Sequence, residues 1–246
     1  KTTFQLNLLV NMIRAYPDRR FYFFSYEEAR KALAVKLLMI LAGETLSATS
    51  NYGAYVNYLK EKRGTNPKID RAIREYEELT SSGRLLVSDD MYPAEDLASV
   101  ISRLTRSGDT GAVIVDYIQR IPLLRPSQGQ RYLEIKQVSA LLLEQAVRQD
   151  IPVILGAQLG RGQGIGSRVR LDNLRESGDI EQDASLVLGL YAEAIENIEA
   201  EDYRSPTRQE PEVDIEVSVL KNRGGIAGKS HKLTFNRPIL TITDKS

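Results

Sequence analysis

The chain has 246 residues, of which 42% are hydrophobic and 27% charged, so it is long and apolar enough for one large α/β domain. Its 33 basic and 33 acidic residues balance, which excludes a broad basic face and leaves any nucleic-acid contact to local loops. The absence of cysteine excludes disulfides and thiolate metal sites and favours a reducing cytoplasm, and no apolar run of about 18 residues predicts a membrane span.

Hydrophobic periodicity predicts alternating helices and strands. The expected order is a helix over 4–15, an aromatic strand over 21–25, a helix over 27–42, a polar helical region over 51–80 broken near Gly64 and Pro67, a strand over 84–88, a helix over 94–106, a strand over 112–116, a helix over 131–149 and a strand over 152–157. A Gly- and Arg-rich loop over 160–172, a strand over 186–191, and a frayed helix with an acidic loop over 192–209 follow.

The segments 214–220 and 232–235 alternate around a Gly-rich turn, which predicts an antiparallel hairpin. Strands that alternate with helices predict a mostly parallel central sheet flanked by helices on both faces. The hairpin is expected as an antiparallel extension at one edge of that sheet. Because no interdomain linker stands out, we expect a single domain over 1–246.

Two short patterns indicate a nucleotide site. Lys1-Thr2-Thr3 precedes an apolar helix, as the end of a P-loop does, where the lysine neutralises phosphate charge and the hydroxyl binds Mg²⁺. An apolar strand that ends in Asp116 has the Walker B form, in which the aspartate holds hydrated Mg²⁺. A solvated strand end would give the same pattern. Tyr117 follows where many such ATPases carry a glutamate, so a water-activating carboxylate must come from elsewhere.

Other polar residues could complete such a site, and each has a simpler explanation. Glu27 follows the aromatic strand beside Glu28, but an acidic first turn also favours the helix dipole. Gln158 ends a buried strand and could sense a γ-phosphate, or could be a polar strand cap. Lys221 and Arg223, one residue apart, suit a phosphate clamp or an arginine finger supplied to a neighbouring subunit, or form a basic hairpin turn.

Arginines and glycines cluster late in the chain. Arg161, Arg168, Arg170 and Arg175 are interleaved with glycines up to Gly178, a composition that can track a phosphate backbone or can simply be solvated. The run 174–184, LRESGDIEQDA, reads as a charged loop that leads into a buried strand. Loops of this kind are where α/β proteins place ligand contacts.

In chain order these motifs are Lys-Thr-Thr, Phe-Phe-Ser-x-Glu, Val-Ile-Val-Asp-Tyr-x-Gln, Gly-Ala-Gln-Leu, LRESGDIEQDA and Lys-x-Arg-x-Gly. Their order resembles the C-terminal ATPase domain of the DnaB-type replicative DNA helicases, and LRESGDIEQDA is the most specific element. The resemblance implies an α/β, RecA-like P-loop fold, cut within its P-loop. It also implies an ATP-dependent motor that unwinds duplex DNA while it translocates on single-stranded DNA.

The resemblance also assigns roles. It places Lys1 and Thr2 on ATP phosphates, Thr2 and Asp116 on Mg²⁺, Glu27 on the attacking water, Gln158 on the γ-phosphate, and Lys221 and Arg223 in the site of a neighbouring subunit. It places Arg175, Glu176 and Gly178, with Arg168 and Arg170 nearby, on single-stranded DNA. Residues 25–28 read Ser-Tyr-Glu-Glu instead of the usual Ser-Leu-Glu-Met, so the choice of Glu27 over Glu28 rests on alignment.

The implied assembly is a homo-hexameric ring in the cytoplasm, with primase and a helicase loader bound through an amino-terminal domain. Two alternatives remain open from the sequence. One is a RadA-like ATPase of recombination and repair, whose Lys-Asn-Arg-x-Gly wording fits 221–225 well but whose fit to LRESGDIEQDA is poorer. The other is an ATPase-like assembly module that does not hydrolyse ATP.

Overall fold

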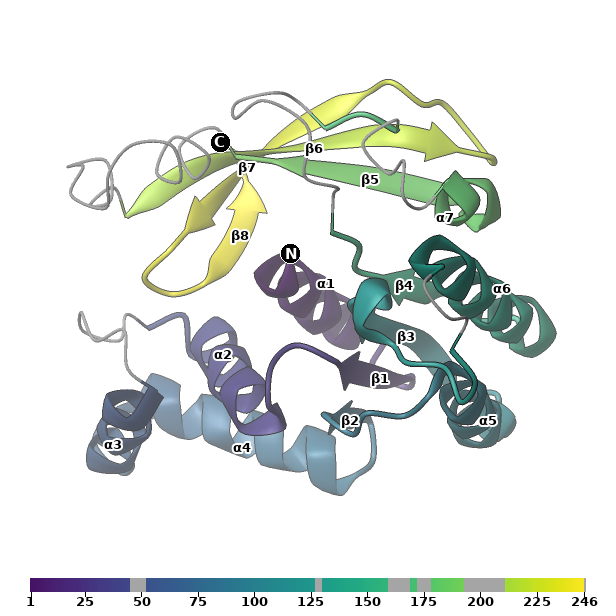
Figure 1. Cartoon of the computed structure of the whole chain (residues 1–246). Coiled ribbons are helices and arrows are strands. Elements are labelled where there is room, and N and C mark those ends of the chain that lie inside the picture. Colours follow the sequence, from purple (N-terminus) through teal and green to yellow (C-terminus); the bar gives the residue numbers. More distant parts are fainter. Residues whose placement is uncertain (45–51, 127–129, 159–168, 172–177, 193–210, 246) are drawn as a thin grey trace. The chain divides into compact units, whose positions relative to one another are not determined.

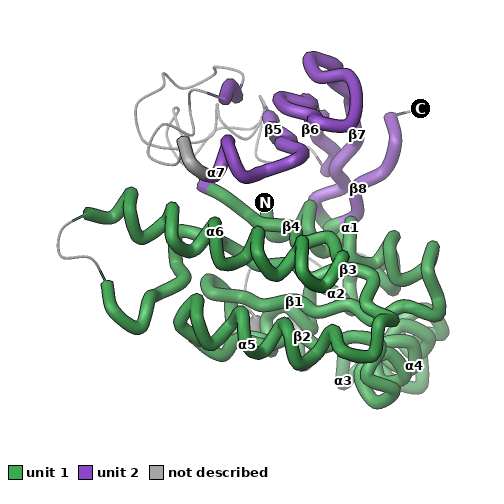
Figure 2. Tube along the Cα trace, turned by 90° about the vertical axis from the view of Figure 1, so that its right-hand side faces the viewer, with its two compact units in different colours: residues 1–157, 238–240 green, residues 158–237, 241–246 purple. Residues whose placement is uncertain are grey.

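The computed structural model describes residues 1–44, 52–126, 130–158, 169–171, 178–192 and 211–245 (Figure 1). The chain forms two compact units, one made of residues 1–157 and 238–240 and the other of 158–237 and 241–246 (Figure 2). Each unit contains one of two four-stranded sheets. In the part of the chain that is described, no helix combines the length and apolar character that crossing a membrane requires.

The first unit alternates strands and helices in the predicted order. Its elements are α1 (Thr2–Ala15), β1 (Arg20–Ser25), α2 (Arg30–Ala42), α3 (Tyr52–Lys62), α4 (Pro67–Ser81), β2 (Leu85–Ser88), α5 (Ala94–Leu104), β3 (Thr110–Asp116), α6 (Arg131–Gln149) and β4 (Val153–Leu155), with 3-10 turns η1 (Thr105–Ser107) and η2 (Ile118–Arg120). The predicted break in the polar helical region is confirmed, because α3 and α4 are separate helices and Asn66 caps the second.

The sheet of this unit is parallel throughout, in the order β2-β1-β3-β4. Its two central strands are almost completely buried, in agreement with their continuous apolar sequences. Phe21 and Phe23 pack into a cluster with side chains of α1, α2 and α4. Tyr22 points to the other face, since side chains alternate along a strand, and its hydroxyl donates to the Leu104 carbonyl of α5 at 3.0 Å.

The second unit contains α7 (Gly178–Asp183), β5 (Leu186–Tyr191), β6 (Glu212–Asn222), β7 (Ser230–Asn236) and β8 (Thr241–Asp244). The predicted hairpin is confirmed as the pair β6–β7. It is more than an edge extension, because the hairpin lies in an antiparallel sheet of order β5-β6-β7-β8. The strand β8 had no sequence signal, since it is four residues long and mostly polar.

Two local predictions were wrong, and long-range contacts explain both. The helix predicted from Glu27 begins at Arg30, whose backbone N–H donates to Asp89 Oδ2 from beyond β2 at 3.0 Å. Part of LRESGDIEQDA, predicted as a loop, is the helix α7, which is anchored by the buried Ile180. The predicted loops over 160–172 and 192–209 lie mostly or almost entirely outside the described residues.

Candidate active site

The first residue of α1 and the last residue of β3 meet at the carboxyl end of the parallel sheet. Thr2 Oγ1 donates to Asp116 Oδ2 at 2.5 Å, and the Asp116 side chain is fully buried. Burying a carboxylate is unfavourable unless hydrogen bonds compensate for the lost water. The structure therefore brings together the hydroxyl and the carboxylate that the sequence analysis placed on Mg²⁺.

The carboxylate of Asp116 is also confined by two residues that the sequence analysis missed. A Cβ atom added to Gly156 would lie 2.9 Å from Asp116 Oδ1 and 3.1 Å from Gln5 Nε2, so the glycine permits this close approach. With its amide nitrogen turned toward Asp116, Gln5 donates to Oδ1 at 3.2 Å and accepts from Gly156 N at 3.0 Å. The motif Gly-Ala-Gln pointed to Gln158, whereas its glycine is the residue that borders the carboxylate.

Tyr117, at the position where many related sites carry a glutamate, gathers two cations. The Lys1 ammonium lies over its ring, 4.4 Å from the centroid, and Arg120 Nε donates to its hydroxyl oxygen at 3.0 Å. The ring is 7% exposed, so it offers a fixed surface to both groups. The hydrogen bond to Tyr117 raises the pKa of Arg120, and the negative charge of Glu27 adds to that shift. Glu27 thus lies within electrostatic reach of these cations.

The structure distinguishes Glu27 from Glu28. Ser25 and Asp116 are register partners in adjacent parallel strands, so the turn after β1 lies at the same sheet edge as Asp116. The Glu28 carboxylate is paired with Lys36 Nζ at 2.6 Å, while Glu27 is exposed and makes no hydrogen bond or ion pair with any described residue. Neither belongs to the first turn of α2, so the helix-dipole explanation of Glu27 is wrong.

The oxygen donors at this edge suit a magnesium–nucleotide complex. Mg²⁺ prefers oxygen ligands and is usually held by one or two carboxylates together with phosphates and water. The Thr2 hydroxyl and the Asp116 carboxylate meet that requirement. Among the residues that the structure describes, no group of three or more His, Cys, Asp or Glu side chains would enclose a metal by protein ligands alone.

In the second unit, the two candidate trans-acting cations lie at the carboxyl end of α7. Lys221 Nζ donates to the carbonyls of Glu181 and of Gln182, the latter at 3.2 Å, and the Arg223 guanidinium also donates to Gln182 O. Cations are favourable here because the last carbonyls of a helix lack helical partners. The sequence offered no signal for this contact, since its acceptors are backbone atoms.

The remaining candidates are less completely described. Gln158 is exposed and follows β4. Gly178 is the first residue of α7. Arg161, Arg168, Arg175 and Glu176 lie outside the described residues.

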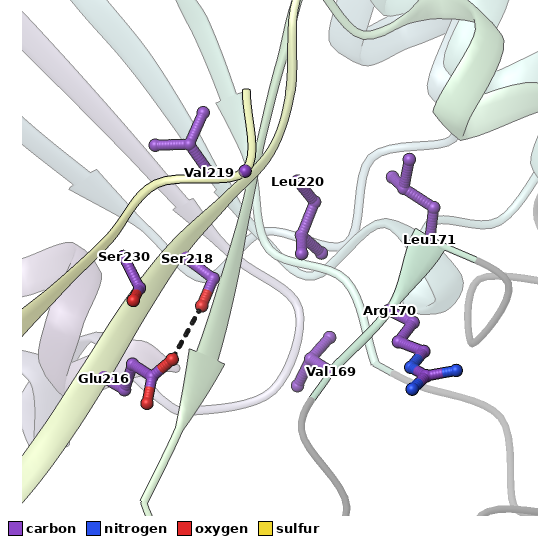
Figure 3. Close-up of a pocket in the computed structure, with 9 residues that line it drawn as sticks. Val169, Arg170, Leu171, Glu216, Ser218, Val219, Leu220 and Ser230 are labelled. Carbon is purple, nitrogen blue, oxygen red and sulfur yellow. Dashed lines mark hydrogen bonds between the residues drawn. The ribbon is translucent and has the colours of Figure 1, made fainter. Parts of the chain in front are cut away.

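Arg170 borders a hollow of about 400 Å³ within the second unit (Figure 3). Val169 and Leu171 line it with Arg170, and Glu216 and Ser218 line it from β6, where Ser218 Oγ donates to Glu216 Oε1 at 3.3 Å. A hollow with both signs of charge lacks the cationic lining that nucleic-acid backbones prefer. Its geometry therefore adds no support to a DNA-binding role for Arg170.

Comparison with known proteins decides the family. Residues 1–244 match the sequence model described as "DnaB-like helicase C terminal domain". The chain belongs to this family. A probable replicative DNA helicase of Trieres chinensis is 30% identical over 234 residues, which are 93% of this chain and 47% of that protein. The chain spans about half the length of the curated DnaB-type relatives that it matches most fully.

Solved structures agree with the RecA-like fold. One of them, an isolated ATPase domain, superposes with a TM-score of 0.76 at 24% identity, covering 100% of this chain and 81% of that one. A DnaB-like replicative helicase, described with its interactions with primase, superposes with a TM-score of 0.75 at 22% identity and covers 99% of this chain and 54% of that one. The DnaB family match covers LRESGDIEQDA and the Lys-x-Arg-x-Gly motif together, so a RadA-like ATPase is not favoured.

Proposed function

We propose that this DnaB-family chain is the ATP-driven motor of a replicative DNA helicase. The observation that carries the proposal is the buried hydrogen bond between Thr2 and Asp116, with an unpaired carboxylate, Glu27, at the end of the neighbouring strand. A hydroxyl, a carboxylate for a metal and a free base at one sheet edge are the groups that nucleotide hydrolysis requires.

Binding would rest on the start of α1. Lys1 and Thr2 would contact the ATP phosphates, whose charge is favoured at a helix N-terminus. Thr2 and Asp116 would hold Mg²⁺, which supplies charge neutralisation at the β- and γ-phosphates. The Tyr117 ring keeps the Lys1 ammonium and Arg120 in place before a nucleotide arrives, so less ordering is needed on binding.

Hydrolysis would begin at Glu27. Its exposed carboxylate would accept a proton from the attacking water, while Glu28 cannot compete because Lys36 holds its charge. Gln158 would contact the γ-phosphate or that water. A base that already carried an ion pair would have to break it first, so the free state of Glu27 favours this assignment.

The cations of the second unit would act on the nucleotide of an adjacent protomer in a hexameric ring. To reach that γ-phosphate, Lys221 and Arg223 would leave the carbonyls of α7. Since α7 begins at Gly178, this exchange would connect nucleotide state to the segment proposed to grip single-stranded DNA. The DNA contacts would come from Arg168, Arg170, Arg175, Glu176 and Gly178. Primase and a loader in the cytoplasm would be further partners.

Mixed rings of the full-length protein test this proposal. Glu27→Gln and Arg223→Ala should each abolish the ATPase activity stimulated by single-stranded DNA. When the two variants are mixed, a fraction of sites should combine an intact Glu27 with an intact Arg223 from a neighbour and recover activity. Glu78→Gln, an exposed carboxylate on α4, is the matched control and should leave activity unchanged. Absence of recovery in rings that still assemble would contradict a shared site, and absence of nucleotide binding would favour the assembly module.

A further inference from the structure

The turn that carries Glu27 is closed by the side chain of the residue two positions before it. Ser25 is the last residue of β1 and is 2% exposed. Its Oγ donates to the Glu28 carbonyl at 2.7 Å and accepts from the Glu28 backbone N–H at 3.0 Å. One buried hydroxyl therefore satisfies both backbone groups of Glu28 and fixes the ends of a turn whose middle residues are Tyr26 and Glu27.

The middle of this turn is tied to the floor of the site on its other side. The Tyr26 backbone N–H donates to the Asp116 carbonyl at 2.7 Å, and its buried hydroxyl donates to the Tyr92 carbonyl at 2.9 Å. Burial raises the pKa of Tyr26, so the hydroxyl keeps its proton and remains a donor. The residues before and after Glu27 are thus both held by hydrogen bonds, while the Glu27 carboxylate is left free.

The exit from the turn is also held. Lys36 binds the Glu28 carboxylate at 2.6 Å, and Asp89 Oδ2 accepts from the first N–H of α2 at 3.0 Å. Of these contacts, those of Ser25 act directly on the backbone next to Glu27 and cannot be replaced by water without opening a buried position. The hydroxyl of Ser25 is therefore the group that most directly determines where the Glu27 carboxylate lies.

We propose that Ser25 is a positioning residue, which holds the turn so that the Glu27 carboxylate faces the water that attacks the nucleotide. The inference rests on the proposed role of Glu27. Without the hydroxyl, the Glu28 N–H and C=O lose their partner and the turn relaxes to restore hydrogen bonds. A shift of about 1 Å at a reacting group lowers a rate by up to about a hundredfold, while binding that does not involve that group persists.

The test is steady-state ATP hydrolysis by the full-length protein with single-stranded DNA. Ser25→Ala should lower kcat about tenfold to a hundredfold and change the KM for Mg-ATP less than about twofold. Ser25→Cys keeps a weaker donor at nearly the same size and should give an intermediate kcat, which preserves the test if the alanine variant folds poorly. Ser99→Ala is the matched control, because this exposed serine of α5 donates to the Glu95 carbonyl at 3.1 Å away from the site.

A double-mutant comparison separates positioning from a general structural effect. In a Glu27→Gln background the base is already lost, so adding Ser25→Ala should slow the residual single-turnover rate less than about twofold. An equal loss in both backgrounds, or an unchanged kcat for Ser25→Ala, overturns the inference while leaving the role of Glu27 intact. Full activity of Glu27→Gln overturns the proposed hydrolytic role of Glu27, and the inference with it.

Discussion

The close approach of Gly156 to Asp116 leads to the most quantitative prediction. In Gly156→Ala the new Cβ would lie 2.9 Å from Asp116 Oδ1, 3.1 Å from Gln5 Nε2 and 3.3 Å from Tyr117 Cβ. The backbone of residue 156 cannot retreat easily, because its N–H donates to Val115 O at 2.8 Å and its carbonyl accepts from Ile118 N at 3.0 Å. The buried carboxylate must therefore move.

Overpacking of this kind costs about 1–3 kcal/mol of unfolding free energy. For a chain of this length each kcal/mol corresponds to about 2–4 °C in Tm, so Gly156→Ala should lower Tm by roughly 2–12 °C. Mg-nucleotide should also stabilise the variant less than the parent, because stabilisation by a ligand follows its affinity and the Asp116 carboxylate is displaced. Thermal unfolding of the full-length protein with and without Mg-ADP measures both effects.

Gly224→Ala is the control for the loss of a glycine. A Cβ there would find its nearest heavy atom, Asn222 Oδ1, at 3.9 Å, so this variant should keep the Tm of the parent within about 1 °C. A Gly156→Ala protein with unchanged Tm and unchanged stabilisation by Mg-ADP would refute the argument that this glycine confines Asp116.

Three further changes test other parts of the first unit. Asp116→Asn keeps the shape of the side chain but removes its charge, and should raise the Mg²⁺ concentration for half-maximal ATPase activity about tenfold or more. Lys36→Met breaks the half-buried ion pair with Glu28 and should cost about 1 kcal/mol in urea unfolding, and an unchanged midpoint would contradict a stabilising pair. The hydrogen bond from Ser107, together with a nearby arginine, lowers the pKa of Asp109, so its stabilisation is present at neutral pH and is lost as the pH falls from 3.8 toward the lowered value. The stability difference between Asp109→Asn and the parent, measured by denaturant titration, should therefore shrink in that range and should not grow.

Much of the framework follows from local patterns. The buried strands β1 and β3, the helix α6 and the hairpin β6–β7 each carry a continuous or alternating apolar pattern that reports which faces are buried. Asp116 was identified as a site residue for the same reason, since an aspartate that ends such a strand stands out against it. These features depend on residues close together in the chain, so the sequence is sufficient to predict them.

The tertiary structure alone decided the rest. Glu27 is separated from Glu28 by the ion pair with Lys36, and α2 begins where Asp89 from beyond β2 supplies its cap. The charged run at 178–183 is helical although it carries little apolar surface, with its last carbonyls bound by cations of β6. Caps, ion pairs and close approaches join residues far apart in the chain, and hydrophobic periodicity contains no information about such partners.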